Sequence, residues 1–168
     1  RLVVVVERED EIVRLLALCR RRQVPVTFRA AGTSLSGQAV TDSVLAVIGD
    51  GWTRCEVGPG ADTIRLQPGV IGGVANRRLA PFARKIGPDP ASIDAAMIGG
   101  IAANNASGMC CGTAQNSYRT LAAMRVVLAD GAVLDTADPA SVEAFRHSHA
   151  DLLATLGALA HETKASTA

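Results

Sequence analysis

The order of apolar and polar residues predicts a strand, a helix and a second strand at the start of the chain. Leu2–Val6 is a largely β-branched run, which is typical of a strand, and Asp10–Arg22 carries apolar residues at helical spacing. Val24–Phe28 returns to the strand pattern. This β-α-β order places the loop after Phe28 at the carboxyl end of a strand, where ligands bind in open α/β sheets.

The rest of the chain indicates further strands and helices joined by turns. Gln67–Gly69 is a turn, and Asp130-Gly131 is a strong hairpin signal. Gly49–Asp62 is rich in glycine and polar residues and is interpreted as a hairpin or a surface loop. We predict strands over Ser43–Ile48, Thr63–Leu66, Thr120–Leu128 and Ala132–Leu134, and helices over Gly73–Ile86 and from about Ala150 to Glu162.

The loop between residues 29 and 38 has the composition of an anion-binding site. Gly32 and Gly37 lack a Cβ, so the backbone can adopt positive φ and bring its N–H groups close to a ligand. Thr33, Ser34 and Ser36 add hydroxyl donors. The pattern favours a phosphate-bearing cofactor, and an ordinary connection between two strands is the alternative.

A second segment of small residues runs from residue 87 to residue 112. Its prolines fix φ and remove N–H donors, which predicts a rigid, extended elbow. Its glycines permit close backbone approach, and its amide and hydroxyl side chains lie among them; a tightly packed core of small residues is the alternative. The residues concerned are Pro88, Pro90, Gly99, Gly100, Asn104, Asn105, Ser107, Gly108 and Gly112. Two such segments suit a long, flat, partly polar ligand between two layers.

These motifs occur in an order that resembles a known flavoprotein family. The chain reads VPVTFRAAGTSLSG from Val24, QPGV from Gln67, GPDPAS from Gly87 and NNASG from Asn104. It resembles the FAD-binding domain of the PCMH-type flavoproteins, typified by vanillyl-alcohol oxidase and p-cresol methylhydroxylase. Within that group it is most similar to D-lactate and other D-2-hydroxyacid dehydrogenases, including large bacterial members with an iron-sulfur region. The resemblance extends to about Thr163.

The resemblance implies an α+β fold with the cofactor between two α/β subdomains. A small β-α-β sheet, about residues 1–48, packs beside a larger mixed sheet with helices, about residues 49–168. The implied cofactor is FAD, held without a covalent bond, because attachment in this family uses a His, Cys or Tyr and none lies between Arg29 and Gln38. Any iron-sulfur cluster is expected outside these residues.

The same resemblance assigns cofactor-binding residues in both small-residue segments. The amides of the first loop hold the pyrophosphate, the proline elbow lines the flavin side, and the remaining residues lie along the rest of the cofactor. The family pattern usually has more glycine at the positions of Ala30 and Ala31, whose methyl groups fit if both residues keep negative φ. The expected contacts are Ala30, Ala31, Gly32, Thr33, Ser34, Leu35, Ser36, Gly37, Gln38, Pro88, Pro90, Ala91, Ser92, Gly99, Gly100, Asn104, Ser107, Gly108 and Gly112.

The implied activity is oxidation of a small D-2-hydroxy acid such as D-lactate, with hydride transfer to flavin. No catalytic base is assigned to this chain, since similar enzymes place substrate-binding groups in a cap beyond the FAD domain. The chain is therefore interpreted as an excised domain that binds FAD but is inactive alone. The alternatives are a flavin-dependent reductase of the UDP-N-acetylenolpyruvoylglucosamine type, with a nicotinamide donor, and a non-catalytic nucleotide-binding module.

Composition limits the partners and the compartment. The 168 residues make about one domain, and 17 Lys and Arg against 16 Asp and Glu give no electrostatic footprint for nucleic acid. No apolar run approaches a membrane span, so we expect a cytoplasmic protein or one peripheral to the inner face of the membrane. Homo-oligomerisation is compatible with the sequence.

The cysteines and histidines do not predict a metal site. Cys19 falls in the apolar stripe of the first helix and is expected in the core, whereas the adjacent Cys110 and Cys111 lie in a glycine-bounded loop. The three histidines, His147, His149 and His161, have no Cys or carboxylate partner at ligand spacing and are expected on the surface.

Overall fold

The computed structural model describes residues 1–165, and these residues form two compact units. The first unit comprises Arg1–Ala122 and Ala129–Gly131, and the second begins at Ala123–Leu128 and continues from Ala132.

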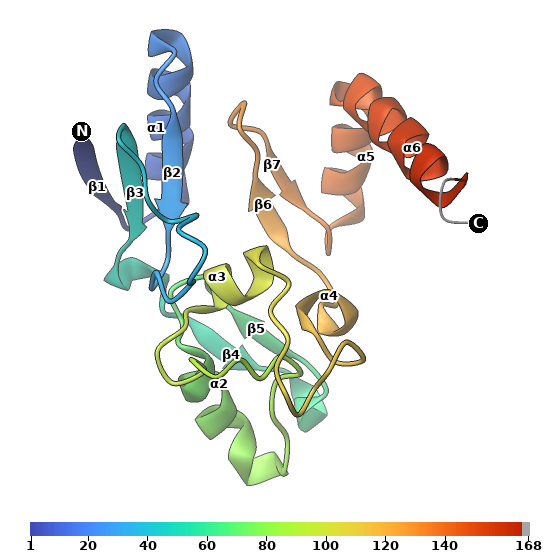
Figure 1. The fold of residues 1–168 in the computed structure, drawn as a ribbon. Helices are drawn as coiled ribbons and strands as arrows, with labels where there is room; N and C mark the ends of the chain where they lie inside the picture. The colour runs from blue at the N-terminus through green and yellow to red at the C-terminus, as the bar shows by residue number, and fades with distance from the viewer. Residues whose placement is uncertain (166–168) are drawn as a thin grey trace. The chain divides into compact units, whose positions relative to one another are not determined.

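The first unit opens with the predicted β-α-β arrangement. β1 (Leu2–Val6), α1 (Glu9–Arg22), β2 (Val26–Arg29) and β3 (Val44–Ile48) agree with the predicted elements to within one or two residues. All strand pairs are parallel and the order is β1-β3-β2, so β3 lies between the two earlier strands (Figure 1). Buried residues of the sheet and of α1 form the core here, among them Val6, Ile12, Cys19, Val44 and Ala46. Cys19 is therefore a core residue, as predicted.

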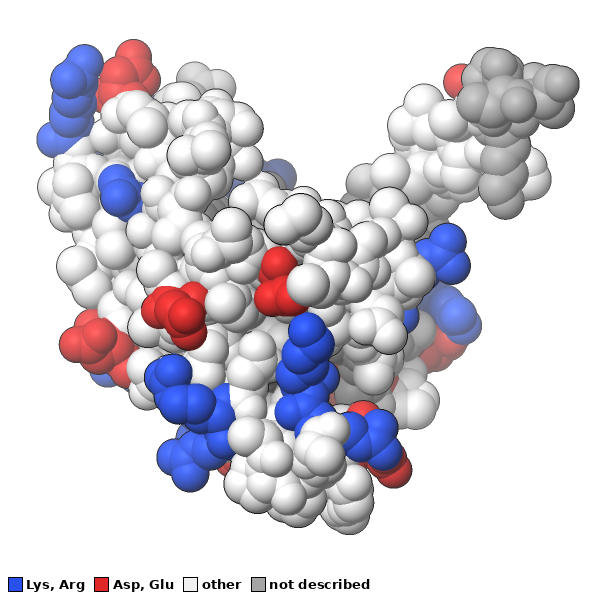
Figure 2. Space-filling model, turned by 60° about the horizontal axis from the view of Figure 1, so that its bottom comes forward, with Lys and Arg blue, Asp and Glu red and all other residues white. Residues whose placement is uncertain are grey.

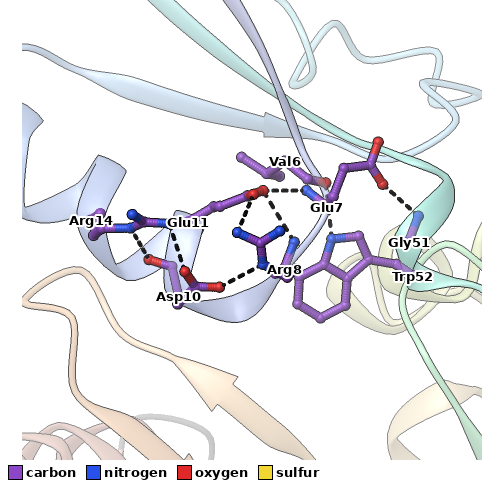
Figure 3. A network of polar contacts seen from close by, with 8 residues as sticks. All are labelled: Val6, Glu7, Arg8, Asp10, Glu11, Arg14, Gly51 and Trp52. Atoms are coloured by element: carbon purple, nitrogen blue, oxygen red, sulfur yellow. Dashed lines mark hydrogen bonds and ion pairs between the residues drawn. The ribbon is translucent and has the colours of Figure 1, made fainter.

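A network of polar contacts fixes the start of α1 (Figure 3). The Glu11 carboxylate accepts hydrogen bonds from the backbone N–H groups of Glu7 (2.7 Å) and Arg8 (3.2 Å), which would otherwise lack partners at the helix start. The same network ties β1 to the following segment, because Trp52 Nε1 donates to the Val6 carbonyl oxygen at 2.9 Å and Gly51 N donates to Glu7. These contacts connect the end of β1 and the residues just after it to the first turn of α1 and to residues 51–52.

An antiparallel hairpin follows the parallel sheet. β4 (Cys55–Val57) pairs with β5 (Ile64–Leu66), and two 3-10 turns, η1 (Asp50–Trp52) and η2 (Pro59–Ala61), precede and join them. The interval Gly49–Asp62, interpreted as a hairpin or a surface loop, contributes both 3-10 turns and β4, whereas β5 lies beyond it.

Three helices complete the first unit. α2 (Gly72–Leu79) gives way to the 3-10 turn η3 (Ala80–Phe82), so the predicted helix over Gly73–Ile86 is too long. Pro81 falls in η3, and Ala83 has a left-handed φ of 54°, which together end the helix. α3 (Ile98–Ala103) and α4 (Ser117–Thr120) were not predicted.

The second unit contains both strands of the hairpin predicted around Asp130-Gly131, although the strand predicted over Thr120–Leu128 begins only at Arg125. β6 (Arg125–Val127) pairs with β7 (Val133–Asp135) in antiparallel register, and Gly131 between them has a φ of 91°. α6 (Ala150–Ala165) matches the predicted last helix, but the preceding α5 (Pro139–Ser148) was not predicted. Of the histidines, His147 and His161 are exposed, and His149 is half-buried and stacks on Phe145.

The α+β class is confirmed, while one detail of the sheets differs. In place of one larger mixed sheet, the described residues form two separate two-stranded antiparallel ribbons, β4-β5 and β6-β7. Basic and acidic side chains lie interspersed on the face shown in Figure 2, with a large uncharged area between them. No helix in the described part of the chain is long and apolar enough to cross a membrane.

Candidate cofactor-binding cavity

The two small-residue segments meet at a cavity within the first unit. Its volume is about 220 Å³, and its walls come from the loop after β2, from the segment before α3 and from α3 itself. The lining residues are Phe28, Ala30, Ala31, Gly32, Thr33, Ser34, Gln38, Ala39, Pro90, Ser92, Ala96, Met97, Gly100, Ile101, Ala103, Asn104 and Ala106. These side chains are all uncharged, so the cavity offers hydroxyls, amides and backbone groups to a ligand.

Gly32 shapes the wall that the loop contributes. Its φ of 69° is left-handed, and a Cβ at this position would overlap the Arg29 guanidinium, with Cζ only 2.7 Å away. Ala30 and Ala31 are not among the residues with positive φ, so their methyl groups add no backbone strain. The loop therefore keeps a close-approach glycine where the turn requires one and accommodates the two alanines beside it.

Ser34 is the feature of the cavity that most directly indicates a ligand. Its Oγ is buried and, among the described residues, has no hydrogen-bond partner, although Ser34 lines the cavity. A buried hydroxyl without a partner costs free energy, and native proteins almost always satisfy such groups with protein, water or ligand. The hydroxyl thus has unused hydrogen-bonding capacity beside the cavity.

Small residues bring α3 close to the opposite wall. A Cβ on Gly100 would lie 3.6 Å from Ala30 Cβ, which shows how near the helix approaches the loop. Met97, Gly100, Ile101 and Asn104 all line the cavity at helical spacing. One face of α3 therefore forms this wall.

The two walls are joined by a hydrogen bond between side chains. Gln38 Nε2 donates to Asn104 Oδ1 at 3.0 Å across 66 residues of sequence. Both residues line the cavity, and both are exposed. The bond bridges the loop after β2 and the carboxyl-terminal end of α3.

The structure brings together part of the predicted contact set. Ala30, Ala31, Gly32, Thr33, Ser34, Gln38, Pro90, Ser92, Gly100 and Asn104 line the cavity. Leu35, Ser36, Gly37, Ser107 and Gly112 are exposed and do not line it, and Pro88 is buried away from it. Gly99 and Gly108 pack on protein instead, since a Cβ would overlap Pro68 in the first case and the Asp89 backbone in the second.

Ala91 lies in a neighbouring hollow on the other side of Pro90. This hollow has a volume of about 250 Å³ and is lined by Asp89, Pro90, Ala91, Ile93, Met109 and Cys110. Cys110 is exposed, whereas Cys111 is buried with its thiol 3.3 Å from the Gly112 carbonyl oxygen. No cluster of three or more His, Cys, Asp and Glu side chains suited to a metal occurs among residues 1–165.

Sequence reasoning missed the apolar part of the lining. Phe28, Ala39, Ala96, Met97, Ile101, Ala103 and Ala106 line the cavity but were not predicted. Had α3 been predicted, its period would have placed Met97 and Ile101 on the same face as Gly100 and Asn104. Their omission follows directly from the missed helix.

The fold and the cavity define an α+β domain in which a loop at the end of a strand and a short helix enclose a cavity with an uncharged lining. Residues 1–137 match the FAD binding domain family, and the chain belongs to this family. Its relatives include glycolate oxidase subunits and D-2-hydroxyglutarate dehydrogenases.

Curated relatives and solved structures agree with this assignment. The chain is 35% identical over 135 residues to the glycolate oxidase subunit GlcD of Escherichia coli K12 (79% of this chain, 27% of GlcD). It is 30% identical over 133 residues to D-2-hydroxyglutarate dehydrogenase of the same organism (79% and 13%). The chain thus spans about a quarter or less of the length of these relatives.

Solved flavoproteins share the fold at low sequence identity. 6-Hydroxy-D-nicotine oxidase from Arthrobacter nicotinovorans superposes with a TM-score of 0.69 at 16% identity, covering 80% of this chain and 30% of its own. Alkyldihydroxyacetonephosphate synthase gives a TM-score of 0.67 at 19% identity, with coverages of 83% and 28%. The structural neighbours are PCMH-type flavoproteins, as the sequence motifs predicted.

Proposed function

We propose that this chain binds FAD without a covalent bond in the cavity between the loop after β2 and α3, and that it serves an oxidoreductase acting on a small D-2-hydroxy acid such as glycolate or D-lactate. The observation that carries the proposal is the partnerless, buried Ser34 hydroxyl in a cavity formed by the two motif-bearing segments. The family supplies the identity of the cofactor.

The chemistry of the lining fits the phosphate part of the cofactor. The loop contributes backbone N–H groups around the left-handed Gly32 and the hydroxyls of Thr33 and Ser34. Converging N–H groups and hydroxyls bind anionic oxygens without needing a charged side chain. FAD, when bound, accepts a hydride, while these residues hold and orient it.

The cavity is too small to enclose the whole cofactor. Pockets that enclose drug-sized ligands have volumes of about 300 to 1,000 Å³, and this cavity is smaller, about 220 Å³. FAD is larger than a typical drug, so only a portion of it fits inside. The remainder extends beyond the lining residues, which supports a role for additional protein surface in completing the site.

The choice of substrate rests on the relatives, and the assignment of proton removal rests on the uncharged lining of this cavity. The proteins GlcD and D-2-hydroxyglutarate dehydrogenase are named for 2-hydroxy acids. Within the described residues the lining contains no Asp, Glu, His, Lys or Arg that could remove a substrate hydroxyl proton. We therefore assign proton removal to groups outside the cavity and cofactor binding to this chain.

A titration of the purified chain with FAD tests the proposal. Quenching of flavin fluorescence should saturate at one FAD per chain, and acid precipitation should then leave the flavin in the supernatant, because no His, Cys or Tyr lines the described cavity. Flavin retained in the acid pellet would contradict non-covalent binding. Absence of saturable quenching would contradict the proposed site.

A further inference from the structure

The loop after β2 has the features of a movable strap over the cavity. We use the name strap for residues 33–38, which follow Gly32 (φ 69°) and include Gly37 (φ 74°). A Cβ on Gly37 would meet nothing within 4 Å, and Leu35 is fully exposed. Little packing therefore holds the strap, and a glycine at each end permits the backbone to change direction.

One side-chain hydrogen bond fastens the strap to the other wall. In the part of the chain that the structure describes, Gln38 to Asn104 is the hydrogen bond that connects the strap to α3. Among the described residues, one backbone hydrogen bond involves the strap, and it is local: Val40 N donates to the Gly37 carbonyl oxygen at 3.1 Å. Fastening across the cavity thus depends on one pair of amides.

This bridge lies at the edge of the space that a ligand must enter. Gln38 and Asn104 both line the cavity, and both are exposed to solvent, so the bond lies where the cavity lining meets the molecular surface. Ser34, whose hydroxyl lacks a partner, belongs to the same strap. The bridge therefore ties the part of the strap that contains Ser34 to the opposite wall of the cavity.

From these contacts we propose that the Gln38–Asn104 bond is a latch, and that the strap must unlatch for FAD to enter or leave. The inference rests on the proposed function, since it concerns the same cavity. In this proposal the Gln38–Asn104 bond is formed both in the free chain and in the FAD complex, so it affects the rates of FAD association and release and not the Kd. Its loss should accelerate entry and release by the same factor.

Flavin association and release rates of the 168-residue chain, measured by stopped-flow fluorescence, test the latch. Gln38→Ala, Asn104→Ala and the double variant should each raise both rates by about two- to tenfold, the range that one neutral hydrogen bond supports. Kd should change little, because in this proposal Gln38 and Asn104, two of the expected cofactor contacts, bond to each other and not to the cofactor. The double variant should resemble each single variant, because the two changes remove one and the same bond.

Gln115→Ala is the matched control, because Gln115 is exposed and lies outside the cavity lining. It should leave both rates unchanged. Faster release with unchanged association would mean that Gln38 or Asn104 contacts the cofactor directly, and the latch would be rejected. Unchanged rates in all variants, or effects that multiply in the double variant, would reject it as well. If the wild-type chain binds no FAD, the proposed function itself fails.

Discussion

At the scale of single residues, Gly32 combines a left-handed backbone conformation with a close approach to the Arg29 side chain. Its φ of 69° is unfavourable for a β-branched residue, and the Arg29 guanidinium occupies the direction in which a Cβ would point. The glycine is thus needed for the turn, whereas the flexible, exposed Arg29 side chain would have to move to admit a Cβ. Gly37 has a similar φ but open space around it, so the two glycines of the loop are not equivalent.

We expect Gly32→Val to weaken FAD binding by at least tenfold, because backbone strain of about 1 to 3 kcal/mol adds to displacement of Arg29. The measurement is a fluorescence titration with FAD. His147→Ala, an exposed change in the second unit, is the control and should leave Kd unaltered. Equal losses in the two variants would place the cofactor elsewhere.

Ser34 permits a prediction in which stability and affinity change in opposite directions. Ser34→Ala removes a buried hydroxyl that has no partner among the described residues, so the free chain should be equally stable or slightly more stable. The same change removes a donor to the cofactor and should weaken FAD binding by about two- to tenfold, or more if the acceptor is a charged phosphate oxygen.

Thermal unfolding and FAD titration of Ser34→Ala, side by side, measure the two effects. Ser36→Ala is the matched control, since Ser36 is exposed and does not line the cavity. A free Ser34→Ala chain of clearly lower Tm would show that the hydroxyl already has a partner in the protein. Unchanged FAD affinity would remove Ser34 from the site.

At the scale of secondary-structure elements, α1 illustrates a helix specified by its own sequence. Acidic residues occupy its first turn and Arg20, Arg21 and Arg22 its last, which matches the helix dipole at both ends. The Arg8 side chain hydrogen-bonds Asp10 and lowers the pKa of that carboxyl, and Arg14 adds to the effect. Each of these signals is local, and the predicted helix was correct.

The lowered pKa of Asp10 gives the start of α1 a defined pH dependence. A carboxyl whose pKa is lower in the folded state stabilises the fold above its unfolded pKa, near 3.8, and this contribution is lost as pH falls through the folded pKa. Asp10→Asn should therefore lower the free energy of unfolding slightly at pH 7 and have less effect near pH 2. Urea unfolding of both proteins at the two pH values measures the difference. An effect that grows towards low pH would contradict this assignment.

The short helix α3 is the opposite case, because its stability comes from tertiary contacts. Its sequence, IGGIAA, contains two glycines, each of which costs roughly 1 kcal/mol in a helix relative to alanine. The Ser117 Oγ lies 3.0 Å from the Ile101 carbonyl oxygen and 2.9 Å from that of Ala106. Ser117 N donates to the Ala106 oxygen, so the single hydroxyl hydrogen is available to Ile101 in α3. Nothing in the local pattern could have revealed that partner.

At the scale of the whole molecule, we expect this chain to bind FAD but not to oxidise a substrate by itself. Excess FAD should raise the thermal stability of this chain by RT ln(1 + [L]/Kd), about 2.7 kcal/mol at a hundredfold excess over Kd. Mixed with FAD, D-lactate or glycolate and an artificial electron acceptor, the chain should nevertheless show no turnover, because the described cavity lining holds no acid-base group. Dye reduction and a thermal shift assay measure the two effects. Robust dye reduction would show that the catalytic groups lie within these residues.

The sequence by itself determined the elements whose signals are local. Alternating or β-branched runs located β1, β2, β3 and β5, helical spacing and charged ends located α1, and Asp130-Gly131 located the β6-β7 hairpin. Glycine and hydroxyl residues also marked Gly32 and Ser34 as parts of a binding loop, since close approach and anion binding require those residue types.

Only the tertiary structure decided which residues of the two small-residue segments line a common cavity. It inserted β3 between β1 and β2, formed α3 from residues of low helix propensity, and paired Gln38 with Asn104. Gly99 and Gly108 pack against other parts of the protein, and Leu35 is exposed to solvent, although all three lie in the small-residue segments. The physical reason is that a motif fixes residue type and backbone freedom, whereas contact across 66 residues depends on packing that no local pattern encodes.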